Sequence, residues 1–128
     1  MKVYLDSSAA MKLLTDEEET IALAEWLDAR PAAEVTSSIL LVPELHRAAI
    51  RVGATHEVAD DLLDGINVVE LSRGVARLAG IVGSSSLRSL DALHLATALT
   101  EDVDVFVAYD HRLQEAARAA GLRVEAPA

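Results

Sequence analysis

Cysteine is absent from the 128 residues of this chain, which excludes a disulfide scaffold, a thiolate zinc site and a thiol nucleophile. Aromatic residues make up only 3% of the sequence, so the core has to be built from Leu, Val, Ile and Ala. No apolar run approaches the ~18 residues that a membrane helix needs. Asp6 also interrupts the apolar stretch that a signal peptide requires. We therefore expect a soluble, cytoplasmic protein with one domain over residues 1–128.

Positive charge is scarce. The chain has 11 Lys and Arg against 21 Asp and Glu, a net charge of −10, which argues against a nucleic-acid binder with a broad basic face. Phosphate chemistry on such a molecule would need metal ions to reverse the sign of the local potential. Five arginines are candidates for phosphate contact: Arg47, Arg51, Arg73, Arg77 and Arg88. Each of them can equally be an ordinary surface charge.

Short β-rich segments alternate with helical ones along the chain. The sequence predicts strands at 2–5, 34–37, 67–71, 103–109 and 122–125, and helices at 7–14, 15–29, 38–52, 55–66, 73–82, 89–100 and 111–120. This alternation predicts an α/β fold with a mostly parallel sheet of about five strands flanked by helices. Thr15 and Glu18 match a capping box, Ser89 is the expected cap of its helix, and Pro43 predicts a kink or a late helix start. Residues 126–128 are expected to form a loose tail.

Two carboxylates follow predicted strands directly. Asp6 comes after the first strand and Asp110 after the strand at 103–109. Open parallel sheets bind ligands beyond the carboxyl ends of their strands, which makes both acids candidate site residues. Each can equally cap the helix that follows it.

Two further acids lie on helices. Asp91 stands at the start of the helix SLDALHLATAL, where the helix dipole alone favours an acid. The rest of that helix is almost entirely apolar, so an ionised group there needs a partner or a cation. Glu44, in ILLVPELHRAAI, either forms a surface pair with Arg47 or Arg51 or serves a site, since leucines flank it.

Four carboxylates brought together by folding would repel one another. A hard divalent cation such as Mg²⁺ or Mn²⁺ relieves that repulsion and supports hydrolysis of a phosphodiester. The chain has no Gly-rich phosphate loop, no HExxH and no GxSxG motif that would indicate another chemistry. The residues therefore indicate a metal-dependent phosphoryl-transfer site, provided that the four acids converge.

Four segments carry a resemblance that covers essentially the whole chain: VYLDSSAAMKLL, SSILLVPELHRA, SLDALHLATAL and VFVAYDHRLQEAARAAGLRV. In this order they resemble the PIN-domain family, in particular the VapC-type toxins of toxin–antitoxin modules. The resemblance implies a three-layer α/β/α sandwich with a parallel sheet, a ribonuclease that uses Mg²⁺ or Mn²⁺, a homodimer, and a VapB-like antitoxin that inserts a segment over the site.

The same resemblance assigns the four acids their roles. It implies catalytic roles for Asp6, Glu44, Asp91 and Asp110, of which Asp6, Asp91 and Asp110 hold the metal directly or through water. Glu44 orients or deprotonates the attacking water. Related proteins often carry a hydroxyl two residues before the last acid, where this chain has Ala108.

Two other polar residues have competing interpretations. Ser8 either orients a ligand or is simply a polar residue at a helix start. His94 shares a helix face with Asp91, so it either bonds a ligand acid or is a satisfied core histidine.

Two other functions remain open. A receiver-like signalling domain needs an Asp after the third strand and a late Lys, whereas this chain has Ser72 there and only Lys2 and Lys12. A non-catalytic PIN-fold interaction module would bind a partner helix through its Ala- and Leu-rich helices. Calorimetry would separate that module from a nuclease, because the module has no need to bind Mg²⁺.

Overall fold

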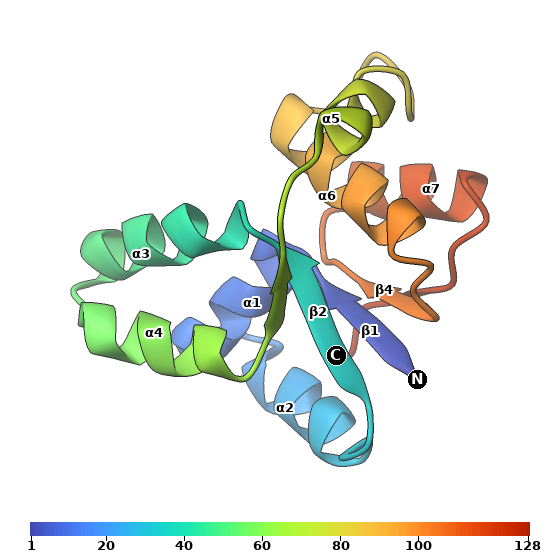
Figure 1. Cartoon of the computed structure of the whole chain (residues 1–128). Helices are drawn as coiled ribbons and strands as arrows, with labels where there is room; N and C mark the ends of the chain where they lie inside the picture. Colours follow the sequence, from blue (N-terminus) through green and yellow to red (C-terminus); the bar gives the residue numbers. More distant parts are fainter.

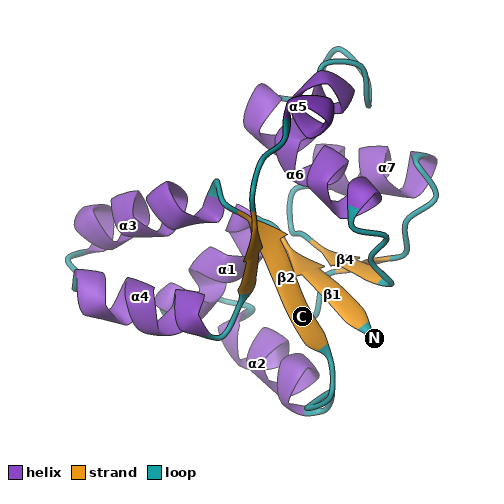
Figure 2. Ribbon diagram, viewed as in Figure 1, coloured by secondary structure: helices purple, strands orange, loops and turns teal.

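Five parallel strands form the centre of the molecule in the computed structural model, which describes residues 1–128. They make one sheet in the order β3-β2-β1-β4-β5 (Figures 1 and 2). The strands are β1 (Lys2–Leu5), β2 (Glu34–Ser38), β3 (Asn67–Val69), β4 (Val105–Val107) and β5 (Val124–Glu125). The α/β fold with a parallel five-stranded sheet is thus confirmed.

Seven helices cover this sheet on both faces. One face carries α1 (Ser7–Leu14), α2 (Thr20–Asp28), α3 (Leu41–Val52) and α4 (His56–Asp64). The other carries α6 (Ser89–Thr100) and α7 (His111–Ala119), and α5 (Arg73–Ala79) packs against α6. The result is the expected three-layer arrangement. None of these helices has the length and apolar character needed to cross a membrane.

The central strands are buried on both faces. In β1, Val3 and Leu5 join the apolar cluster under α1–α4, whereas Tyr4 joins the cluster under α6 and α7; all three are fully buried. In β4, Phe106 faces the same side as Tyr4. Because successive side chains of a strand point to opposite faces, each of these strands contributes to both apolar clusters.

The pairing of β1 with β4 brings together two distant parts of the chain. Leu5 lies opposite Val107, and the Asp6 backbone N–H donates to the Val107 carbonyl oxygen at 3.2 Å. Both strands run in the same direction, so their carboxyl ends meet at one edge of the sheet. The segment that begins at Asp6 and the segment that ends at Asp110 therefore lie side by side.

Two helix starts differ from the sequence prediction. The capping box at Thr15 is wrong: Thr15 ends α1, and both its N–H and its hydroxyl donate to the Met11 carbonyl oxygen. The next helix begins only at Thr20. Ser89 lies inside the first turn of α6 instead of capping it, because Arg88 occupies the cap position.

The late start at Pro43 is confirmed. α3 begins at Leu41, which places the proline in the first turn, where its missing N–H is not needed. At the other end of the chain, the Tyr109 hydroxyl donates to the Pro127 carbonyl oxygen at 2.7 Å. This bond ties the expected loose tail to the body of the protein.

Candidate active site

Asp6 is a buried carboxylate at the end of β1. Its Oδ1 accepts the Ala9 backbone N–H at 2.9 Å, which caps α1, and the Ser8 hydroxyl at 2.7 Å. Only 1% of the residue is exposed. Burial raises the pKa of Asp6 to about 6, against the opposing effect of the hydrogen bonds from Ser8 and Ala9. No protein group donates to Oδ2, so capping uses one carboxylate oxygen and leaves the other for a ligand.

Ser8 links the two strand ends. While it donates to Asp6, its oxygen accepts the Tyr109 backbone N–H at 3.1 Å. The interpretation of Ser8 as a residue that orients an acid thus describes its contacts better than simple helix-start polarity. Asp110, the next residue along, caps α7 through the Leu113 N–H at 3.1 Å and is exposed to solvent.

Asp91 interacts electrostatically with each of the other three acids. Burial is the first cause that raises the pKa of Asp91, and the charge of Asp110 is the second; Glu44 raises it further and His94 opposes the rise. Asp91 in turn raises the pKa of Asp6. Asp91 is thus coupled electrostatically to Asp6, Glu44 and Asp110, which come from separate elements, although no three histidine or acidic side chains lie close enough together to hold an ion.

Glu44 has a different partner from the one its sequence context suggested. The surface pair with Arg47 or Arg51 does not form. Its Oε1 lies 2.8 Å from Nε2 of His94, which is fully buried, and His94 Nδ1 lies 2.7 Å from the Tyr4 hydroxyl. Both interpretations of the histidine hold, since it is a satisfied core residue that bonds a candidate acid.

His94 links two residues through its two ring nitrogens. Nε2 faces the Glu44 carboxylate and Nδ1 faces the Tyr4 hydroxyl, so both nitrogens have a hydrogen-bond partner. Burial raises the pKa of Tyr4 above its usual range, which keeps that hydroxyl protonated. The Tyr4 ring stacks on Phe106 with centroids 5.3 Å apart, so the donor is held rigidly.

Tyr4 was not among the predicted site residues. A signal for it exists in the sequence, because a tyrosine in the middle of a strand buried on both faces needs a partner for its hydroxyl. The identity of that partner depends on how α6 lies on the sheet, and the sequence does not specify this.

Lys12 on α1 is committed to other acids. Lys12 Nζ lies 2.7 Å from Glu19 and 3.6 Å from Glu17, and it sits over the Tyr109 ring. No ion pair reaches the candidate metal-binding acids, which are Asp6, Asp91 and Asp110. The charge of Arg88 lowers the pKa of Asp91, but no basic side chain lies within 4.0 Å of these three carboxylates.

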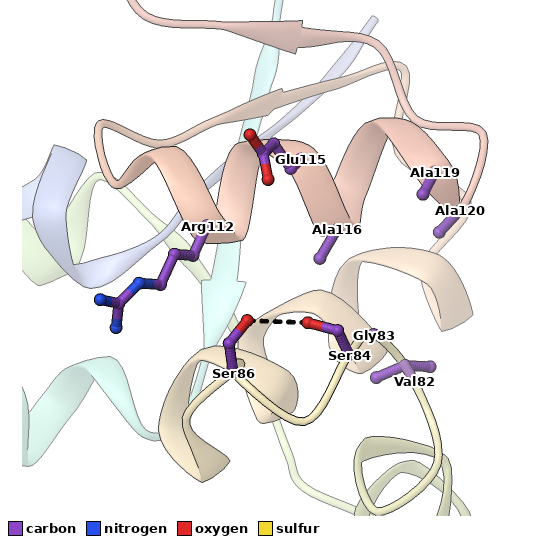
Figure 3. Close-up of a pocket in the computed structure, with 9 residues that line it drawn as sticks. All are labelled: Val82, Gly83, Ser84, Ser86, Arg112, Glu115, Ala116, Ala119 and Ala120. Carbon is purple, nitrogen blue, oxygen red and sulfur yellow. Dashed lines mark hydrogen bonds between the residues drawn. The ribbon is translucent and has the colours of Figure 1, made fainter.

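Two cavities border this region, and only one of them touches the acids. The larger, about 490 Å³, runs along α7 from Arg112 to Ala120 and is closed by the loop with Ser84 and Ser86 (Figure 3). It contains none of the four acids. A second cavity of about 370 Å³ is lined by Glu44 and lies over α3.

Comparison with known proteins identifies the family. A model of the PIN domain matches residues 3–119. The chain belongs to the PIN-domain family. This PIN domain is similar to the Mycobacterium tuberculosis protein named Ribonuclease VapC47, with 40% identity over 131 residues that cover 98% of the chain and 96% of the relative. It is also 37% identical to Ribonuclease VapC46 of the same organism, over 98% of the chain and 97% of the relative.

Solved structures share the fold of this PIN domain at low sequence identity. VapBC2 from Rickettsia felis, solved with a promoter DNA fragment, matches over 100% of both chains with a TM-score of 0.75 and 13% identity. M. tuberculosis VapC20, described as a toxin that cleaves the sarcin–ricin loop, matches over 94% of this chain and 95% of its own with a TM-score of 0.72 and 15% identity. The resemblance to VapC-type PIN domains is confirmed.

Proposed function

We propose that this PIN domain is a VapC-type endoribonuclease that hydrolyses RNA phosphodiester bonds with Mg²⁺ or Mn²⁺. The observation that supports this most is the Asp6 carboxylate, which is buried, without a compensating cation, and coupled to Asp91. A buried ionised acid destabilises a fold unless a cation accompanies it. Near-full-length similarity to proteins named ribonucleases supplies the reaction class.

The donor set fits a hard cation in its chemistry. Asp6, Asp91 and Asp110 offer only carboxylate oxygens, the ligands that Mg²⁺ and Mn²⁺ prefer. As the side chains stand, no three histidine or acidic groups lie close enough together to hold an ion. Ion binding would have to draw the carboxylates together against the repulsion that raises the pKa of Asp91.

The residues of the chain then have distinct tasks. When bound, Mg²⁺ supplies polarisation of the phosphodiester and a lowered pKa for the attacking water. Glu44 accepts the proton of that water or orients it, and His94 keeps the Glu44 carboxylate in place through the bond from Nε2. Ser8 holds Asp6 in the rotamer that leaves Oδ2 free.

Partners are proposed from the relatives. Structural neighbours include a toxin–antitoxin complex from Klebsiella pneumoniae, with a TM-score of 0.73, and VapBC-1 from Haemophilus influenzae, with a TM-score of 0.67. We infer that this chain is the toxin of such a module, inhibited by a VapB-like antitoxin that inserts a segment over the site. A homodimer and a cytoplasmic location complete the proposal.

The test is RNA cleavage by the purified protein with Mg²⁺, with Mn²⁺ and with EDTA. Asp91→Asn is nearly isosteric, so it removes charge and little packing. We expect cleavage to fall by about a hundredfold or more, as loss of an electrostatic catalytic group does. Calorimetry with Mg²⁺ alone should show weakened binding in the same variant.

Asp61→Asn is the matched control, because Asp61 is an exposed acid on α4 outside the coupled group. It should retain full cleavage and Mg²⁺ binding. Full activity in Asp91→Asn, or in EDTA, would rule out the metal-dependent mechanism.

A further inference from the structure

The cavity beside Glu44 combines an apolar floor with two cations. It has a volume of about 370 Å³, within the range of small-ligand sites. One stripe of α3 forms most of it, together with one residue each from α1 and α6. The lining residues are Met11, Leu40, Pro43, Glu44, Arg47, Arg51 and Leu90.

Its position connects it to the reaction. Glu44 lies both in this cavity and in the coupled acid group. Leu90, which also lines the cavity, directly precedes Asp91 in the first turn of α6. A ligand in the cavity therefore lies next to any phosphodiester bound at the acids.

The two arginines of the cavity carry positive charge that the protein leaves without an ion pair. Although acids outnumber bases by 21 to 11, no carboxylate lies within 4.0 Å of Arg47 or Arg51. They stand one helical turn apart on the same exposed face, about 6 Å along the axis. Residues four apart are neighbours on a helix surface, so both guanidinium groups can contact the phosphates of one strand that crosses the cavity.

The apolar part matters because exposed aromatic platforms are lacking. Tyr4 and Phe106 are fully buried, and Trp26 is covered by the Arg30 guanidinium on α2. Single-stranded RNA is usually held by stacking of bases on aromatic rings or on guanidinium planes. Within the cavity the surface available for a base is aliphatic, and Leu90 contributes strongly because it is 52% exposed.

We propose that this cavity is a nucleotide subsite for the RNA strand next to the scissile bond. The base packs between Leu90 and the apolar side of α3, and Arg47 and Arg51 contact the flanking phosphates. The proposal rests on the proposed ribonuclease function and adds the residues that place the strand across the acids.

The first experiment measures binding of a fluorescein-labelled single-stranded RNA heptamer by anisotropy in Ca²⁺, with a gel to show that the RNA stays intact. The Arg47→Gln/Arg51→Gln double variant should bind about tenfold more weakly or worse, because charge-assisted hydrogen bonds to phosphate are lost. The slope of log affinity against log salt should fall by about 0.7 for each phosphate contact removed. In Mg²⁺, KM should rise while kcat stays within about twofold.

The matched control is Arg118→Gln, an exposed arginine in the last turn of α7 that also has no ion pair. Its affinity and salt slope should equal those of the wild type. If the double variant matches this control in binding, slope and KM, the arginines serve another partner and the subsite is refuted.

The second experiment tests the base pocket with RNAs that carry one abasic nucleotide at successive positions. In the wild type, one position beside the cleaved bond should reduce affinity most. Leu90→Ala should lower the affinity for the intact RNA. It should leave unchanged the affinity for the RNA that is abasic at that position, since both changes remove the same contact. Additive losses at every position would refute the pocket.

The two proposals fail in distinguishable ways. If the wild type cleaves RNA and the arginine and leucine variants behave like the control, the subsite is wrong and the nuclease stands. If the wild type neither binds nor cleaves RNA in Mg²⁺ or Mn²⁺, both are wrong.

Discussion

Asp6→Asn should stabilise the metal-free protein while it abolishes cleavage. Asparagine keeps the Oδ1 acceptor for the Ala9 N–H and the Ser8 hydroxyl, and it is as good a helix cap as aspartate. It removes only the negative charge from a position with 1% exposure, next to Asp91. Under the proposed mechanism, the site therefore carries a destabilising charge that metal binding needs.

The size of this effect follows from the pKa of Asp6. Folding raises that pKa from 3.8 to about 6. Below pH 3.8 the protonated Asp6 carboxyl group thus contributes to the free energy of unfolding in full. This contribution is lost as the pH rises through 6. At 1.36 kcal/mol for each pH unit, the ionised group lowers the free energy of unfolding by about 3 kcal/mol above pH 7. For a chain of this length that is about 10 °C in Tm.

Thermal unfolding in EDTA at pH 4 and pH 8 tests this reasoning. Relative to wild type, Asp6→Asn should gain about 10 °C at pH 8 and little at pH 4. Adding Mg²⁺ at pH 8 should raise the wild-type Tm and leave the variant nearly unchanged, because only the wild type binds the ion well. Asp61→Asn should show neither effect. A variant less stable than wild type at pH 8, or a gain that is the same at both pH values, would refute the reasoning.

Three further outcomes are expected. Tyr4→Phe removes the hydroxyl that bonds His94 Nδ1, so it should lower kcat about tenfold and leave Mg²⁺ affinity unchanged. Tyr109→Phe removes a hydroxyl bonded to Pro127 and should leave kcat unchanged. Equal kcat values in the two variants would refute the positioning role of Tyr4. Ser8→Ala should raise the pKa of Asp6 further, because one hydrogen bond to the carboxylate is lost, and shift the acidic limb of the pH–rate profile upward; an unchanged limb would contradict this. Cleavage by the wild type should fall below pH 6 and be partly rescued by added Mg²⁺, since protonated carboxylates are poor ligands, and a profile insensitive to Mg²⁺ would count against it.

The sequence predicted the strands and most helices because their signals are local. Strands β1 and β4 are short runs of mostly apolar, β-branched or aromatic residues, and caps such as Thr55 and Ser72 act within a few residues. The capping box at Thr15 failed because its hydroxyl is used by the end of α1, a competition that the motif alone does not reveal.

The acids proposed for the candidate site carry signals in the sequence, whereas the contacts that support them do not. Asp6 and Asp110 follow strands, and Asp91 stands out against an apolar helix, so all three carry a signal in their own segments. The bond between Glu44 and His94 joins residues 50 positions apart and depends on how α3 and α6 meet. Such contacts are fixed by tertiary packing and leave no periodic trace in the chain.

The position of β4 has a consequence for protein synthesis. The first acid of the site is made within the first few residues, but its neighbours on the adjacent strand end are among the last segments translated, since Val3 pairs with Val105. A nascent chain on the ribosome has to wait for β4 before the sheet can close, and pairing over such a separation is intrinsically slow. The two strand ends that carry Asp6 and Asp110 therefore meet only when most of the chain has been made.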